Sequence, residues 1–190
     1  GGRLPYDAII IANRAYDYRA DLAEQNARLL DYVQAGGTLV VEHQGRRWDP
    51  ARFAPYPGTK PGRRNLRVTV ETAPVRVLAA GHPLLRFPNR ISEDDWKGWV
   101  QGRGLYFWQT WSEEYTALLE MADPGEEPLR GSLLYARHGA GVYIYCGLGL
   151  FRQVRAGIPG GVRLYVNLLS QGRAAPPTEA AKQPVLEEQR

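Results

Sequence analysis

The stretch Gly36–Gln44 reads GGTLVVEHQ, which predicts a buried strand that ends in three polar residues. In α/β enzymes, such a strand often delivers reactive side chains at its carboxyl end. Here it delivers Glu42, His43 and Gln44, with no cysteine or serine beside them. His43 is a candidate base and Glu42 its candidate partner, although adjacent strand residues point to opposite faces. The alternative, which we favour, is that His43 and Gln44 bind backbone groups of the loop.

A second cluster of acidic, aromatic and basic residues spans positions 93–103. Indoles stack on the apolar faces of sugars, while carboxylates, amides and guanidinium groups bind their hydroxyls. We therefore expect a carbohydrate site formed by Asp95, Trp96, Trp99, Gln101 and Arg103. Adjacent aspartates at 94 and 95 are poorly spaced for paired-carboxylate catalysis. In the alternative, the acidic residues cap a helical turn and the tryptophans pack beneath an inserted segment.

A third candidate is the loop Asn13–Asp17, which follows another expected strand at the end where α/β folds bind ligands. This loop should lie beside the Glu42–Gln44 loop. The resulting crevice would be lined by Arg14, Tyr16, His43 and Arg152. In the alternative, an Arg14–Asp17 salt bridge simply fixes the loop, and the sequence leaves both interpretations open.

Composition excludes several other functions. Cys146 is the only cysteine, which rules out an internal disulfide and a cysteine-based zinc site. The three histidines lack ligand spacing, so we expect no metal and no cofactor. The net charge is +4, yet no nucleic-acid-binding motif accompanies the arginines, and we favour a solvated basic surface. No apolar run approaches the roughly 20 residues of a membrane span, and no signal peptide is recognisable.

Hydrophobic patterning predicts a strand–helix–strand unit at the start of the chain. Residues 6–12 and 38–41 are continuous apolar runs, which are typical of parallel strands buried on both faces. Between them, Asp21 as N-cap and Gly36 as the stop signal bound an amphipathic helix. Such a unit implies a right-handed crossover between the two strands. The apolar run at residues 6–12 is typical of a strand inside a sheet rather than at its edge. We therefore expect further strands and a helix before it, in a longer polypeptide.

The remainder is less regular. A Pro-, Gly- and Arg-rich excursion is expected over residues 45–67, and Ser92 should cap a short turn. Strands are expected at 66–70, 75–78, 105–108 and 116–121, a hairpin at 132–146, and a final helix at 160–170. We therefore expect one domain over residues 1–170, followed by a disordered tail or linker over residues 171–190.

Two sets of phrases resemble known families. Residues 6–10, 30–41 and 139–149 resemble the glutamine amidotransferase-like (ThuA-like) superfamily. Residues 83–91, 98–107 and 131–137 resemble, more specifically, the C-terminal domain of large bacterial PIG-L/LmbE-type deacetylases. The resemblance extends from about Tyr6 to Ser170.

This resemblance implies a flavodoxin-like, class I glutamine amidotransferase-like α/β fold. Its mixed, mainly parallel sheet would be flanked by helices, with an irregular insertion in the middle. It also implies a bacterial origin, export as part of a larger protein, and a zinc deacetylase site in a separate N-terminal domain. That zinc motif is missing here, because His82-Pro83 is followed by two leucines. Glutaminase activity is not expected either, since the strand before His43 delivers no cysteine.

Our leading hypothesis is therefore a non-catalytic accessory domain of a larger deacetylase-like protein, which binds carbohydrate or its partner domain. One alternative is a hydrolase that uses His43 as its base. Another is a structural domain for assembly, for which the sequence does not fix an oligomeric state. All three hypotheses draw on the candidate residues named above. The positions of these residues in the folded protein are needed to distinguish the hypotheses.

Overall fold

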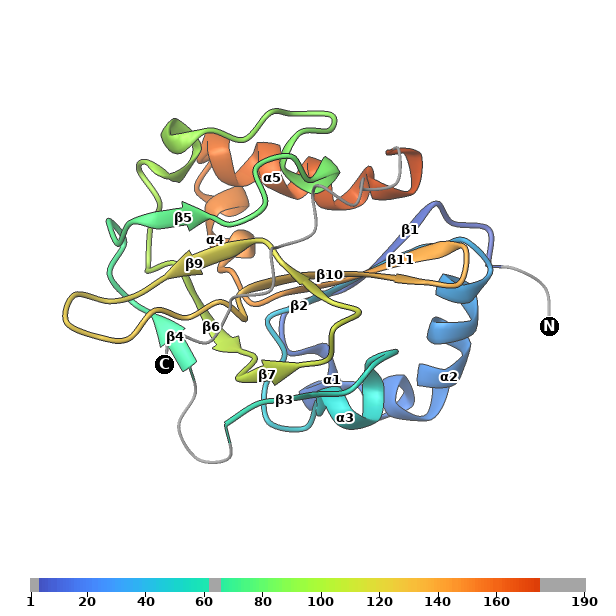
Figure 1. Ribbon diagram of the computed structural model, residues 1–190. Coiled ribbons are helices and arrows are strands. Elements are labelled where there is room, and N and C mark those ends of the chain that lie inside the picture. Colours follow the sequence, from blue (N-terminus) through green and yellow to red (C-terminus); the bar gives the residue numbers. More distant parts are fainter. Residues whose placement is uncertain (1–3, 62–65, 175–190) are drawn as a thin grey trace.

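The computed structural model describes residues 4–61 and 66–174. Its centre is a five-stranded sheet in the order β1-β2-β11-β10-β8 (Figure 1). Its strands are β1 (Ala8–Ile11), β2 (Thr38–Glu42), β8 (Thr116–Ala117), β10 (Leu133–His138) and β11 (Gly141–Cys146). Strands β1, β2 and β11 run parallel, whereas β10 is antiparallel to both β11 and β8. The predicted parallel pair at residues 6–12 and 38–41 and the predicted hairpin are both confirmed.

The expectation of a flavodoxin-like, mainly parallel sheet flanked by helices is wrong. Two neighbouring pairs in the sheet are parallel and two are antiparallel. The reason is local, because the short turn at Gly139–Ala140 can join only antiparallel strands. In addition, the chain between β2 and β8 supplies no long crossover helix in its described part, so it adds no parallel strand.

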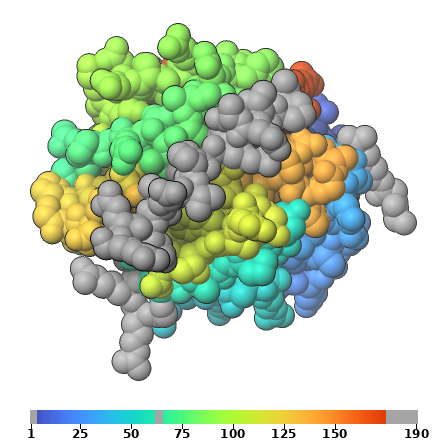
Figure 2. Space-filling model, viewed as in Figure 1, coloured from blue at the N-terminus to red at the C-terminus, as the bar shows by residue number. Residues whose placement is uncertain are grey.

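The middle of the chain instead forms three small antiparallel sheets of two strands each. They pair β3 (Gly58–Thr59) with β7 (Thr110–Trp111), β4 (Leu66–Val68) with β6 (Gly104–Phe107), and β5 (Val75–Val77) with β9 (Leu119–Met121). The green part of this region, which includes β5, lies in the upper part of the surface in Figure 2, whereas β3 and β7 lie in the lower part, as labelled in Figure 1. Residues 62–65 of the expected excursion lie outside the described residues.

The helices are short except for two. They are α1 (Ala15–Tyr18), α2 (Ala20–Gln34), α3 (Pro50–Phe53), α4 (Leu150–Arg155) and α5 (Pro159–Leu169), with 3₁₀ helices η1 (Pro83–Leu85), η2 (Glu93–Trp96) and η3 (Gln171–Arg173). Helix α2 begins two residues earlier than expected, with Arg19 rather than Asp21 at the N-cap. Helices α1, α3 and α4 were not predicted. Three residues of the expected tail form η3, and residues 175–190 lie outside the described residues.

Alternating residues of the central strands divide the core between the two faces of the sheet. Val40 and Ile144 belong to one apolar cluster together with Leu164 and Leu168 of α5. Leu39 and Tyr143 face the other side, with Tyr32 of α2 among others. This division follows from the two-residue period of a strand. It explains why β2 and β11 are buried along their whole length, with α2 on one face of the sheet and α5 on the other.

Strand β1 forms one edge of the sheet, since among the described residues it pairs only with β2. Its residues Ala8, Ile9 and Ile10 are half-buried. The expectation that further strands precede β1 stays a prediction. The register of β2 and β11 places Glu42 opposite Cys146, so the polar end of β2 begins where β11 ends.

Candidate functional site

His43 stands immediately after β2, at the carboxyl end of the parallel strands. Its φ of 42° lies in the left-handed region, which is uncommon for a non-glycine residue. Its amide donates to the carbonyl of Cys146 (2.7 Å), and its carbonyl accepts from the amide of Arg14 (3.2 Å). These two bonds confirm that the loop after β1 lies beside the loop after β2. They also hold residue 43 in a conformation that it would not adopt alone.

The His43 imidazole is buried, with only 3% of the residue exposed. Its Nδ1 lies 2.9 Å from Oδ1 of Asn13, and the edges of Tyr106 and Phe151 enclose the ring. Burial, reinforced by the charges of Arg152 and Arg14, lowers its pKa to about 4. The ring is therefore neutral at pH 7. Because an amide oxygen only accepts, Nδ1 carries the proton, and Nε2 is left without a partner among the described residues.

Glu42 faces the opposite side of the sheet, where its charge acts on Cys146 and Tyr165. Burial raises its pKa to about 7, and Oε1 has no hydrogen-bond partner in the described structure. His43 and Glu42 thus have different neighbours, as the strand geometry predicted. Burial also raises the pKa of the Cys146 thiol far above its usual value. Among the described residues at this strand end, His43 does not pair with a glutamate, and burial disfavours the thiolate form of Cys146.

Four non-glycine residues of the described chain have a left-handed backbone: Arg14, His43, Gln101 and Tyr106. They are connected to one another. The amide of Arg14 binds the carbonyl of His43, and the Tyr106 ring lies 5.1 Å from the imidazole. The carbonyl of Gln101 accepts from Nη1 of Arg152, whose charge acts on His43. Such residues cost about 1–3 kcal/mol each and tend to cluster at functional sites, which makes this strand end the leading candidate site.

Tyr16 of the expected crevice and the neighbouring candidate Gln44 have structural partners instead. The Tyr16 hydroxyl binds the side chain of Asn26 inside the protein. The Gln44 amide accepts from the Tyr16 backbone and donates to the carbonyls of Ala12 and Glu42. Gln44 therefore satisfies loop backbone groups, as the favoured alternative expected.

The two arginines of the crevice reach the surface. Arg14 forms the expected salt bridge with Asp17 (2.9 Å), although 43% of its side chain stays exposed. Arg152 is half-buried and lies over the ring of Phe151. The surface part of this site is thus basic, while the imidazole beneath it is neutral.

The aromatic cluster is mostly buried. Trp96 and Trp99 are 6% and 3% exposed, and their rings lie 5.6 Å apart. Asp95 forms a capping box with Ser92, as predicted for that turn, and an ion pair with Arg163 of α5 (2.9 Å). Its carbonyl accepts from the Trp99 indole. The alternative interpretation therefore describes most of this cluster: the acidic residues cap the helical turn, and the tryptophan side chains pack inside the protein.

Two residues of the cluster have other surroundings. Gln101 is exposed, and its backbone amide donates to Glu71. Arg103 is buried, at 4% exposure, and donates to the carbonyls of Ala73 and Trp96. Together with Trp96 and Trp99, Arg103 lines a pocket of about 760 Å³. The structure thus places Trp96, Trp99 and Arg103 around one pocket, whereas the backbone carbonyl of Gln101 accepts a hydrogen bond from Arg152.

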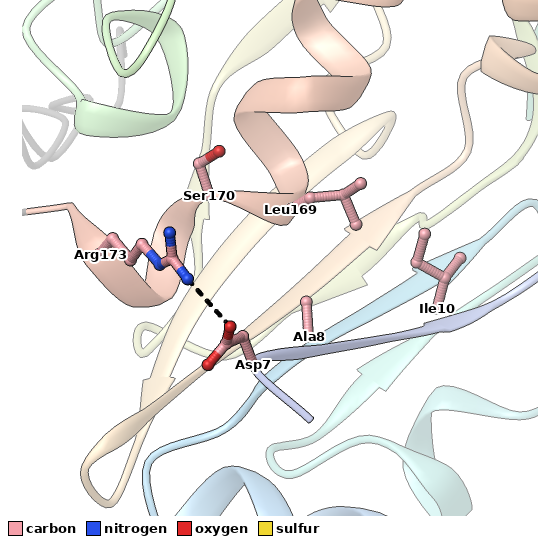
Figure 3. Close-up of a pocket in the computed structure, with 6 residues that line it drawn as sticks. All are labelled: Asp7, Ala8, Ile10, Leu169, Ser170 and Arg173. Atoms are coloured by element: carbon pink, nitrogen blue, oxygen red, sulfur yellow. Dashed lines mark hydrogen bonds and ion pairs between the residues drawn. The ribbon is translucent and has the colours of Figure 1, made fainter. Parts of the chain in front are cut away.

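A separate pocket of about 510 Å³ opens at the β1 edge (Figure 3). An ion pair between Asp7 and Arg173 (3.0 Å) lies at one side, and Ile10 and Leu169 line the other. Asp7 and Arg173 are largely exposed, so this pair contributes little to stability. Among the described residues that line this pocket, the charged ones, Asp7 and Arg173, are exposed, and His43 is not part of the lining.

The site includes residues that the sequence did not indicate. Asn13 orients the imidazole, and its position directly after a strand was the only available signal. Tyr106 and Phe151 enclose the ring, but their own sequence context indicated only a strand and a loop. Within the described residues, no group of three His, Cys, Asp or Glu side chains could hold a metal ion. No helix there is long and apolar enough to cross a membrane.

No family model and no curated protein matches the chain. Among solved structures, it is similar to the cytoplasmic protein STM3548 from Salmonella typhimurium, with 14% identity and a TM-score of 0.57 over 87% of this chain and 71% of that one. It is also similar to a β-galactosidase from Rahnella sp. R3, with 16% identity and a TM-score of 0.52 over 90% of this chain. This chain spans 23% of that β-galactosidase. At these identities, the likeness shows the fold alone.

Proposed function

We propose that this chain is a non-catalytic accessory domain of a larger protein of the PIG-L/LmbE deacetylase type, and that it binds carbohydrate or its partner domain. The observation that carries the proposal is the occupant of the left-handed position after β2. An exposed nucleophile would be required there for amidotransferase chemistry. The position instead holds a buried, neutral histidine, and the only cysteine of the chain is enclosed behind it.

Two further observations support an accessory role. The four residues with a left-handed backbone lie in the loops at this strand end, and such strained residues tend to cluster at functional sites. Because the described part of this strand end presents no nucleophile, we infer that its function is binding rather than catalysis. In addition, a similar fold occupies only 23% of the β-galactosidase from Rahnella, so this architecture also occurs as one part of a much larger chain. The basic surface formed by Arg14 and Arg152 gives the domain a defined binding face.

One observation favours a second candidate function, a hydrolase with His43 as its base. The Nδ1 proton is held by Asn13, and the Nε2 lone pair is free among the described residues. A neutral imidazole oriented in this way is the protonation state that a general base needs at pH 7. However, the ring is enclosed by Tyr106 and Phe151, and a substrate proton would have to reach it past these side chains.

A turnover assay separates the two functions. The purified chain would be incubated with glutamine, with p-nitrophenyl acetate and with N-acetylglucosamine, and each product would be quantified. We expect no turnover above that of a His43→Ala variant. A His138→Ala variant is the matched control, since His138 lies at the far end of β10. Turnover that is lost in His43→Ala and kept in His138→Ala would overturn the accessory role in favour of the hydrolase.

A further inference from the structure

Arg103 is a buried cation without a counter-ion in the described structure. Its Nε and Nη2 donate to the carbonyl of Ala73 (2.9 and 2.8 Å), and Nη1 donates to the carbonyl of Trp96 (2.6 Å). No carboxylate among the described residues forms an ion pair with it. Backbone carbonyls satisfy donors but do not neutralise the charge. Because a buried charge is costly unless it is paired, an anion bound at this guanidinium would offset that cost.

The guanidinium retains donors for such an anion. Nη1 and Nη2 each carry a second N–H group, and neither of these has a protein partner among the described residues. A carboxylate matches two N–H groups of one guanidinium in a planar, bidentate arrangement. The face of the Trp99 indole lies beneath, with the guanidinium carbon 5.5 Å from its ring centroid. Arg103 is therefore held rigidly in place before any ligand arrives.

The pocket beside Arg103 has room for a small ligand. Its volume of about 760 Å³ is within the range of small-molecule sites. Arg103, Trp96, Trp99 and Val75 form part of its lining, and the charged residues around it are Glu71, Glu93 and Lys97. Lys97 is already paired with Asp94, so it adds little attraction. The two glutamates disfavour a doubly charged phosphate, whereas a single carboxylate matches the single unpaired cation.

We propose that this pocket binds an acidic sugar of the uronate class, with its carboxylate on Nη1 and Nη2 of Arg103 and its ring against the indoles of Trp96 and Trp99. The sugar part of this assignment rests on the carbohydrate-binding role proposed above. The carboxylate part rests on the unpaired guanidinium. The pocket thus gives the aromatic cluster a ligand even though its indoles are too buried for stacking on an open surface.

Calorimetric titration with glucuronate and with glucose, which differ at one carbon, tests the assignment. We expect glucuronate to bind at least about tenfold more tightly than glucose, with the difference shrinking in Arg103→Gln. Arg28→Gln, an exposed change of the same type on α2, is the matched control and should leave both affinities unchanged. No binding of glucuronate, or equal binding of the two sugars by the native chain, would overturn the proposal.

Arg103→Gln also removes bonds to two backbone carbonyls, so it could unfold the protein. Glu93→Gln provides a second, independent test, because Glu93 is exposed and lines the same pocket. It removes a repulsive charge, and we expect glucuronate to bind roughly threefold more tightly, with glucose unaffected. An unchanged glucuronate affinity would contradict the proposal. Failure here leaves the accessory role standing, since that role is overturned by turnover in the separate assay.

Discussion

Glu42 allows a quantitative test of the strand-end electrostatics. Burial raises its pKa from 4.5 to about 7, so the folded protein holds this carboxyl neutral in a range where the unfolded chain ionises it. Since one pKa unit corresponds to about 1.36 kcal/mol, the difference amounts to about 3 kcal/mol. This stability is fully present below pH 4.5 and is lost as the pH rises through 7. Glu42→Gln should therefore be more stable than the native chain by about 3 kcal/mol at pH 8.5, and similar to it at pH 4.5.

The assay is urea unfolding of the two proteins across this pH range, followed by circular dichroism. Other groups with shifted pKa values, such as His43 and Lys60, contribute equally to both proteins and cancel in the difference. Glu93→Gln serves as the control at an exposed position and should follow the native curve. If Glu42→Gln keeps the native pH dependence, or is destabilised by the same amount at every pH, then Glu42 is not a neutral buried acid and the reasoning fails.

Three further predictions concern buried groups. Cys146 is enclosed and its pKa is strongly raised, so Ellman's reagent at pH 8 should detect no fast thiol in the native chain and one thiol after denaturation. Asn167→Ala should lower the free energy of unfolding by about 3 kcal/mol, because its buried amide binds the carbonyl of Leu84 in η1 and both backbone groups of Asn89. The half-buried Ser170→Ala should change it by less than about 1 kcal/mol. Gly160→Ala should lower the free energy of unfolding by more than about 2 kcal/mol, because a methyl group at this position would clash with the backbone of η2. Thermal unfolding measures this effect, and the exposed Val162→Ala is the control that should show little change.

The parts of the fold that depend on nearby residues could be predicted from the sequence. The hairpin follows from a glycine-containing turn between two apolar runs, and the capping box follows from Ser92 and Asp95 alone. The parallel β1–β2 pair follows from one helix of suitable length between two apolar strands. The small sheets of the middle could not be predicted, because each pairs segments that lie far apart in the chain.

The site was predictable to a similar degree. Topology alone places Arg14 beside His43, since both follow neighbouring parallel strands. It does not indicate that Trp96 is buried, because that depends on how η2 packs against α5. Nor does it show that Arg103 has no carboxylate partner among the described residues, because ion pairing depends on all the side chains that the fold brings close to the guanidinium. Exposure and charge compensation are properties of the whole fold, and these two properties decide what the pocket can bind.

The backbone of residue 43 shows why a similar fold does not imply a shared activity. A left-handed histidine is unfavourable by about 1–3 kcal/mol, and hydrogen bonds to Cys146, Arg14 and Asn13 offset that cost. Two of these bonds involve only the main-chain groups of residue 43, so the neighbouring loops impose the same conformation on any side chain at this position. The sharp turn after β2 is thus a property of the fold, while the reaction depends on which side chain the turn presents. In this chain the turn presents a buried, neutral imidazole, so the turn by itself does not specify a reaction.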